Sequence, residues 1–275
     1  MTALMSVGVA SASQISDASL HQLLALSGVK QQVQEIPNGL RASLKQAEEQ
    51  AQERAGTAGA KAALSDEFRE TGKAMIRAFN PDDMLGAIAK QIKRTMSEKD
   101  ARAMLAWFNS PLGKRITQAE EAAATPAAAR QILASAKTLL ADKPRVQFAR
   151  EQDKLLHLTD DLASFQENTA VASFVAFSGA EHPGRAVPIQ GFRAKVAVAI
   201  EQDRPRLEQF TIIKSVYTYR HIDLPSLQKY LAFLKTKPAL RFNKSVAVGL
   251  NTAAREATDK LAKGVVHDGQ RGAHQ

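Results

Sequence analysis

The amino-acid sequence predicts an all-α protein, and three observations indicate that class. Alanine, leucine, lysine, arginine, glutamine and glutamate, which favour helices most strongly, are abundant along the 275 residues. Only 15 glycines and 10 prolines interrupt them. Apolar residues also recur at three- and four-residue spacing, as on one face of a helix. With 44% hydrophobic residues, the chain has enough apolar material for a sizeable core.

The first third of the chain contains a series of helix start and stop signals. Ser16 is an N-cap residue by type, and Gly28 is a stop signal for the helix that follows it. The next apolar pattern meets Pro37, where we expect a break or a kink because proline lacks a backbone N–H. Asn80 and Pro81 have the order of an N-cap and a first-turn proline, so another helix is predicted to begin there.

The clearest helix signal opens at Ser97. Ser97 and Asp100 have the spacing of a capping box. The apolar residues that follow fall on one stripe of a helix: Ala101, Met104, Leu105 and Phe108. The segment 105–115, "LAWFNSPLGKR", then predicts a joint between two helices rather than an active-site loop. Its Ser110 is suited to cap a helix that Pro111 begins.

The second half of the sequence echoes the first at a shift of 124 to 126 positions. Residues 227–241 resemble residues 101–115, so that Trp107 corresponds to Phe233. A shared proline and similar distances to the upstream helix signals favour an internal duplication over a chance likeness of two amphipathic helices. We therefore predict two diverged antiparallel multi-helix repeats packed together.

The predicted organisation has four parts. They are a truncated signal segment at residues 1–12, a first helical repeat at 13–142, a second at 143–262 and a disordered tail at 263–275. Within the second repeat, β-branched residues are frequent between positions 190 and 222, where a β-hairpin is the alternative to a helix. Pro205 lies 124 residues after Pro81, and this register favours the helix.

The N-terminal residues indicate export. The stretch "ALMSVGVASA" is apolar and small, and it ends in Ala10-Ser11-Ala12, which resembles the cleavage site of a secretory signal. The basic residues that usually precede such a stretch are missing, which a start codon assigned too far downstream would explain. No later run reaches the ~20 apolar residues of a membrane span. The expected localisation is therefore the periplasm.

The sequence offers little catalytic or metal-binding chemistry. It contains no cysteine, which excludes disulfides, thiolate catalysis and cysteine-bound metals. Its six histidines form no metal-binding spacing, and no nucleotide-binding glycine motif occurs. His182, beside Glu181 in a Pro/Gly-rich loop, is the least ordinary histidine. Glu120 and Glu121 are interpreted as a solvated helix face. We thus expect no catalytic, cofactor-binding or metal residues.

Four aromatic residues are the candidates for a functional or packing site: Trp107, Phe108, Phe233 and Tyr230. Trp107 lies about 100° around the helix from Phe108, off the main apolar stripe. It is therefore expected either to pack between the repeats or to line a groove, and large aromatic residues favour packing.

The net charge of +9 and the pI of about 9.7 bear on partners. Nucleic-acid binding proteins usually gather their positive charge on one face, whereas here acidic and basic residues alternate along the chain. Nucleic acid is therefore not an expected partner. An envelope protein, or an anionic envelope component such as a lipid headgroup or polyanion, fits this charge better.

The pieces together resemble the bacterial exported family called domain of unknown function 2059. Residues 23–28, "LLALSG", fit its early helix, and residues 105–114, "LAWFNSPLGK", fit its later aromatic and Ser-Pro-x-Gly segment. The second copy departs from this pattern, because Thr236-Lys237-Pro238-Ala239 lacks the serine and the glycine. The resemblance implies an exported, helical and mostly periplasmic protein, and it implies no known activity.

These observations favour an uncharacterised, non-enzymatic periplasmic protein with a binding or scaffolding role. Two alternatives remain open. One is a cell-envelope hydrolase with a carboxylate and histidine site, which a cluster of such side chains in a pocket would favour. The other is a polyanion or nucleic-acid binding protein, which requires one contiguous basic face.

Export makes a direct prediction about the mature chain. Because the small residues Ala10-Ser11-Ala12 precede it, Ser13 should be the first residue of protein purified from the native periplasm. Intact-mass measurement checks this. Full-length protein recovered only from the cytosol would contradict the assignment.

Overall fold

The structure is a computed structural model that describes residues 13–182, 185 and 187–272. The described chain folds into helices joined by short turns. In chain order these helices are α1 (Asp17–Leu26), α2 (Val29–Arg54), α3 (Ala58–Ala78), α4 (Pro81–Thr95), α5 (Glu98–Asn109), α6 (Pro111–Ala123), α7 (Pro126–Ala134), α8 (Ala136–Ala141), α9 (Lys143–Leu156), α10 (Leu158–Glu181), α11 (Ile189–Thr218), α12 (Leu224–Leu234) and α13 (Lys237–Gly272).

The predicted all-α class is confirmed. In the part of the chain that the structure describes, the only β-type pairing is an isolated bridge between Gln14 and Ser97. The β-hairpin alternative for residues 190–222 is wrong, because α11 spans most of that segment as one helix. None of the described helices has an apolar stretch of the length and hydropathy that a membrane span requires.

The helix starts lie where the capping residues predicted them. The hydroxyl of Ser16 accepts a hydrogen bond from the N–H of Ser19 at 3.2 Å. Ser97 and Asp100 form both halves of the capping box. The hydroxyl of Ser110 accepts from the N–H of Gly113 at 3.0 Å, so the segment 105–115 is a joint between α5 and α6. These bonds satisfy N–H groups that a helix start otherwise leaves without partners.

Of the break or kink expected at Pro37, the break is wrong. α2 continues from Val29 to Arg54 with Pro37 inside it. A proline removes only one hydrogen bond of the helix, and here its ring is buried together with Val33 and Leu40. We infer that this packing compensates for the missing bond.

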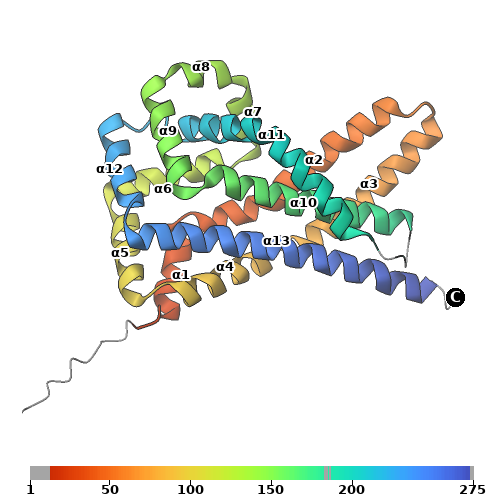
Figure 1. The fold of residues 1–275 in the computed structure, drawn as a ribbon, viewed down its shortest axis with the longest axis horizontal. Helices are drawn as coiled ribbons and strands as arrows, with labels where there is room; N and C mark the ends of the chain where they lie inside the picture. Colours follow the sequence, from red (N-terminus) through yellow and green to blue (C-terminus); the bar gives the residue numbers. More distant parts are fainter. Residues whose placement is uncertain (1–12, 183–184, 186, 273–275) are drawn as a thin grey trace, which may run out of the picture.

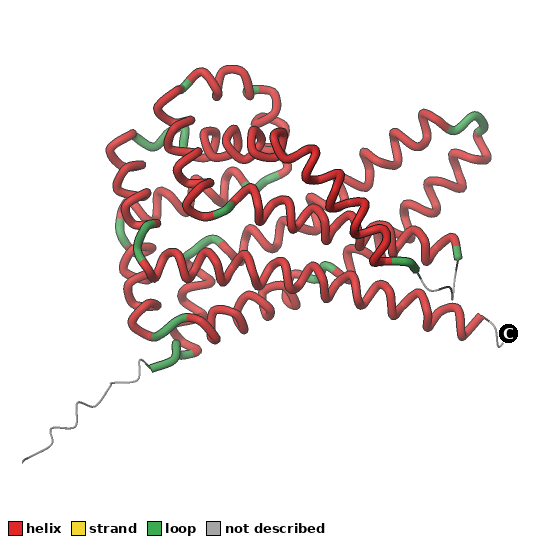
Figure 2. Tube along the Cα trace, viewed as in Figure 1, coloured by secondary structure: helices red, strands yellow, loops and turns green. Residues whose placement is uncertain are grey.

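Three long helices, α10, α11 and α13, run through the body of the molecule (Figure 1). α13 packs along α4 and along α10, and α10 also packs against α11. α2 and α3 pack against each other, and their outer ends form a helical hairpin that projects from the body (Figures 1 and 2).

The hydrophobic core has three parts that cross the predicted boundary between the repeats. The largest cluster joins side chains of α1 to α5 with side chains of α10 and α13. A second joins α6 to α9 with α11, and a third joins α6 and α9 with the α11–α12 region. The helices of residues 13–142 and 143–262 therefore pack into one another. The two-repeat arrangement itself stays a prediction.

The C-terminal segment differs from the predicted tail. α13 continues as helix to Gly272, ten residues into the segment expected to be disordered, and residues 273–275 lie outside the described residues. No proline follows Pro238 to stop this helix, so the pattern begun in the core carries on. The predicted signal segment at residues 1–12 also lies outside the described residues.

α4 and α13 approach each other unusually closely at Gly249. A Cβ atom added to Gly249 would lie 2.5 Å from the Cα atom of Ile88. Only glycine permits two helix backbones to come this near without displacement. Polar contacts flank the crossing: Lys260 bonds to Asp83 at 2.7 Å, and at the opposite end the hydroxyls of Thr95 and Ser245 lie 2.7 Å apart.

Candidate functional site

Three of the four predicted aromatic residues lie together. The ring of Trp107 stacks on that of Phe233 with centroids 4.1 Å apart and planes 6° apart. The ring of Tyr230 stacks beside both, with its centroid 5.8 Å from that of Trp107 and 6.5 Å from that of Phe233. The structure thus brings a residue of α5 against two residues of α12. The contact joins positions that the internal alignment equates, because Trp107 and Phe233 are counterparts.

The fourth predicted residue, Phe108, lies apart from this stack. It is buried and meets Phe242 of α13 edge to face, with centroids 5.9 Å apart. It belongs to the largest core cluster, together with Met104 and Ala101. Its role is therefore helix packing at the predicted joint.

A half-buried carboxylate lies beside the aromatic stack, at Glu120 of α6. Tyr219 donates a hydrogen bond to its Oε1 atom at 2.6 Å, and Tyr230 donates to the same atom at 2.8 Å. Gln152 of α9 donates to the hydroxyl of Tyr219, and the Ser215 hydroxyl donates to the side-chain oxygen of Gln152. Four helices, α6, α9, α11 and α12, are connected by this network. The interpretation of Glu120 as a solvated residue is wrong.

The surroundings of Glu120 disfavour its charge. Removal from water raises the pKa of the Glu120 carboxyl, and the hydrogen bonds from Tyr219 and Tyr230 oppose that rise only in part. The same burial, with the nearby carboxylate, raises the pKa of both tyrosines. The tyrosines therefore remain protonated and act as donors, and the group as a whole cross-links helices.

Histidine and carboxylate side chains that could serve a hydrolase are spread over α4 and α10. His182 is exposed at the end of α10, and Asp82 is exposed in the first turn of α4. Asp160 is paired with Arg204 at 2.8 Å, while burial and the charge of Asp160 raise the pKa of Asp161 to about 6. Within the described residues, no group of three or more His, Asp or Glu side chains is placed to hold a metal ion.

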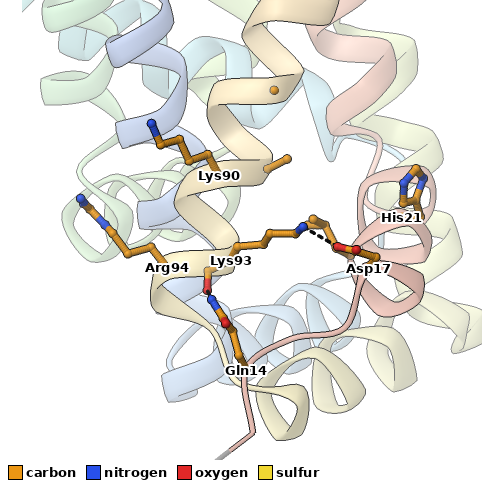
Figure 3. Close-up of a pocket in the computed structure, with 9 residues that line it drawn as sticks. Gln14, Asp17, His21, Lys90, Lys93 and Arg94 are labelled. Atoms are coloured by element: carbon orange, nitrogen blue, oxygen red, sulfur yellow. Dashed lines mark hydrogen bonds and ion pairs between the residues drawn. The ribbon is translucent and has the colours of Figure 1, made fainter.

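A groove of about 630 Å³ lies between α1 and α4 (Figure 3). Three residues of its lining are apolar or small, Leu20, Gly86 and Ala89, and we call these three its floor. Polar and charged side chains complete the lining: Gln14, Asp17, His21, Lys90, Lys93 and Arg94. Apolar floors with a few polar groups around them are typical of ligand sites.

Side-chain size keeps the groove open. Nothing lies within 4 Å of the position that a Cβ atom on Gly86 would take. α4 buries Met84, Ile88 and Ile92 on its core side, and helical spacing turns Gly86 to the opposite side. At the 124-residue shift, Gly86 corresponds to Phe210. A phenylalanine side chain at position 86 would occupy this space, so the groove stays open because residue 86 is glycine.

The groove is spanned by one ion pair. Lys93 reaches from α4 to Asp17 on α1, whereas the side chains of Lys90 and Arg94 point away from Asp17 (Figure 3). The hydrogen bond and charge of Lys93 hold the pKa of the Asp17 carboxyl below its usual value. At the lower end, the side-chain amide of Gln14 donates to the carbonyl of Lys93 at 2.9 Å. Positive charge exceeds negative charge around the opening.

The sequence did not predict this groove. Its cations belong to the polar face of an ordinary amphipathic helix, which by itself indicates only solvation. A usable signal was present in α4, where two small residues, Gly86 and Ala89, lie on the same face as Lys90 and Lys93. These residues can be recognised as the wall of a groove only once the structure shows that α1 lies alongside α4.

Comparison with known proteins finds a match to one family over part of the chain. Residues 82–142 match the model of domain of unknown function 2059, an uncharacterised protein family conserved in bacteria. The resemblance drawn from the sequence is confirmed over these residues, which run from the first turn of α4 to the end of α8. No curated protein and no solved structure matches the chain.

The Glu120 network predicts a specific pH dependence of stability. The folded-state pKa of Glu120 is raised, so the folded protein holds this proton more tightly than the unfolded chain does. The free energy of unfolding should therefore fall as the pH rises above about 4.5, through the folded-state pKa. Glu120→Gln should flatten this fall, and Glu208→Gln, on an exposed residue of α11, should leave it unchanged. Urea denaturation between pH 4.5 and 8.5 measures both, and identical slopes would contradict the assignment.

Proposed function

We propose that this chain is an exported binding protein, and that its ligand surface is the groove between α1 and α4. The observation that carries the proposal is the combination of an apolar floor with an excess of cations in one recess. Export is supported by the apolar start that ends in Ala10-Ser11-Ala12. A binding or scaffolding role, rather than a catalytic one, agrees with the scattered positions of His182 and Asp82.

The floor supplies apolar contact without requiring rearrangement of the core. Leu20 is 4% exposed and belongs to the largest core cluster, so the base of the groove is part of a rigid structure. Ala89 is half-buried and Gly86 is exposed. A ligand that covers them removes apolar surface from water, which stabilises a complex by about 25 cal/mol for each Å² covered.

The charge of the lining selects for acidic ligands. The lining holds three cations, Lys90, Lys93 and Arg94, and a single carboxylate, that of Asp17. Lys93 is engaged with Asp17, so an incoming carboxylate or phosphate would compete for it. The other two cations have long flexible side chains that can turn toward a bound anion. Because all of them are partly or fully exposed, their attraction should weaken as salt is added.

A titration with a defined acidic probe tests this function. Decaglutamate added to ¹⁵N-labelled protein should shift the amide signals of α1 and α4 more than those of the other helices. The double variant Lys90→Glu with Arg94→Glu should lower the affinity for the probe by about tenfold or more, because two cations become carboxylates. Asp17→Asn should bind it more tightly, because Lys93 is released.

The control is a charge-matched variant away from the groove. Lys195 on α11 and Lys229 on α12 are exposed, and changing both to glutamate alters the net charge by the same amount. If this control weakens the probe as much as the groove variant does, the binding reflects net charge alone and the proposed site is wrong.

A further inference from the structure

The groove has the form of a place for a helix. It runs between two helices, and its lining positions on α4 extend from Gly86 to Arg94. Nine residues of helix cover about 12 Å along the axis, which two to three turns of another helix would match. Gly86 and Ala89 lie about one turn apart on the same face of α4, and charged side chains are also part of the lining.

In the second half of the molecule, other helices cover the helix face that corresponds to the groove. At the 124-residue shift, Ala89 corresponds to Ile213 and Lys93 to Tyr217. Ile213 and Tyr217 of α11 are buried in one cluster with Ile132 of α7 and with Leu139 of α8. The face of α11 that corresponds to the groove is therefore covered by two short helices.

Contacts between the halves support the equivalence of these positions. Trp107 and Phe233, which are counterparts, stack on each other. Arg115 lies 3.7 Å from Asp223 at the start of α12. Arg241 of α13 lies 2.8 Å from Asp100 at the start of α5. Both ion pairs join the first half of the chain to the second.

We propose that the groove between α1 and α4 is a docking surface for an acidic amphipathic helix of a partner protein. This inference rests on the proposed binding function and adds the class of partner. The helix places small apolar side chains over Leu20 and Ala89, and its carboxylates meet Lys90, Lys93 and Arg94. Binding of an amphipathic helix in a groove by its apolar face is a recurring mode of recognition.

Crosslinking in the native cell tests the partner class. A photoreactive phenylalanine analogue replaces Ala89, which lies in the floor and is half-buried. The same analogue at Ala197, an exposed position on α11, is the matched control. The crosslinked peptide is then sequenced. The expected result is a protein adduct at position 89 alone, through an acidic segment with helical apolar periodicity.

A second measurement uses the captured segment as a synthetic peptide. It should become helical on binding, as circular dichroism reports, and Lys90→Glu with Arg94→Glu should weaken it by about tenfold or more. Lipid adducts only, no adduct at position 89, or capture of a basic or extended segment would each overturn the helix proposal. If decaglutamate still binds at the groove in that case, the proposed function stands. If it does not, both proposals fail.

Discussion

The close crossing of α4 and α13 determines how the rest of the molecule is arranged. At this crossing Gly249 meets the backbone of Ile88, and hydrogen-bonded side chains hold both ends. α4 therefore has its apolar side committed to α13, and helical geometry turns the other side toward α1. The groove is a consequence: its wall on α4 is the side that the crossing leaves uncovered. The same helix thus provides a packed face and one wall of the groove.

A second constraint lies where α6, α9, α11 and α12 meet. The Glu120 carboxylate accepts from two tyrosines that come about 100 and 110 residues later in the chain. A buried carboxylate is unfavourable unless donors surround it, so this group specifies one arrangement of the four helices. The stack of Trp107 on Phe233 lies directly beside it and joins α5 to α12. We regard this region as structural, and three of the aromatic residues chosen from the sequence, Trp107, Tyr230 and Phe233, pack there.

Local chemistry explains which features the sequence predicted. The capping residues Ser16, Ser97 and Ser110 act within three residues of the helix starts, and their spacing is visible in the sequence. The break expected at Pro37 does not occur, because the effect of a proline depends on how it is buried in the folded chain. The partners of Glu120 were missed for the same reason, since Tyr219 and Tyr230 approach it only in the folded chain. The groove could not be predicted from the sequence, because it forms where the polar sides of α1 and α4 lie next to each other in the folded chain.

The central claim is that open space at Gly86 and Ala89 is used for binding. Its most direct test fills that space with the residues found at the corresponding positions of α11, as Gly86→Phe with Ala89→Ile. Gly86 is exposed with nothing within 4 Å of its Cβ position, so the variant should keep the thermal midpoint of the wild type. Calorimetric titration with decaglutamate should show that its affinity is lost or greatly reduced. A filled variant that is stable and binds the probe as tightly as the wild type does would contradict this account.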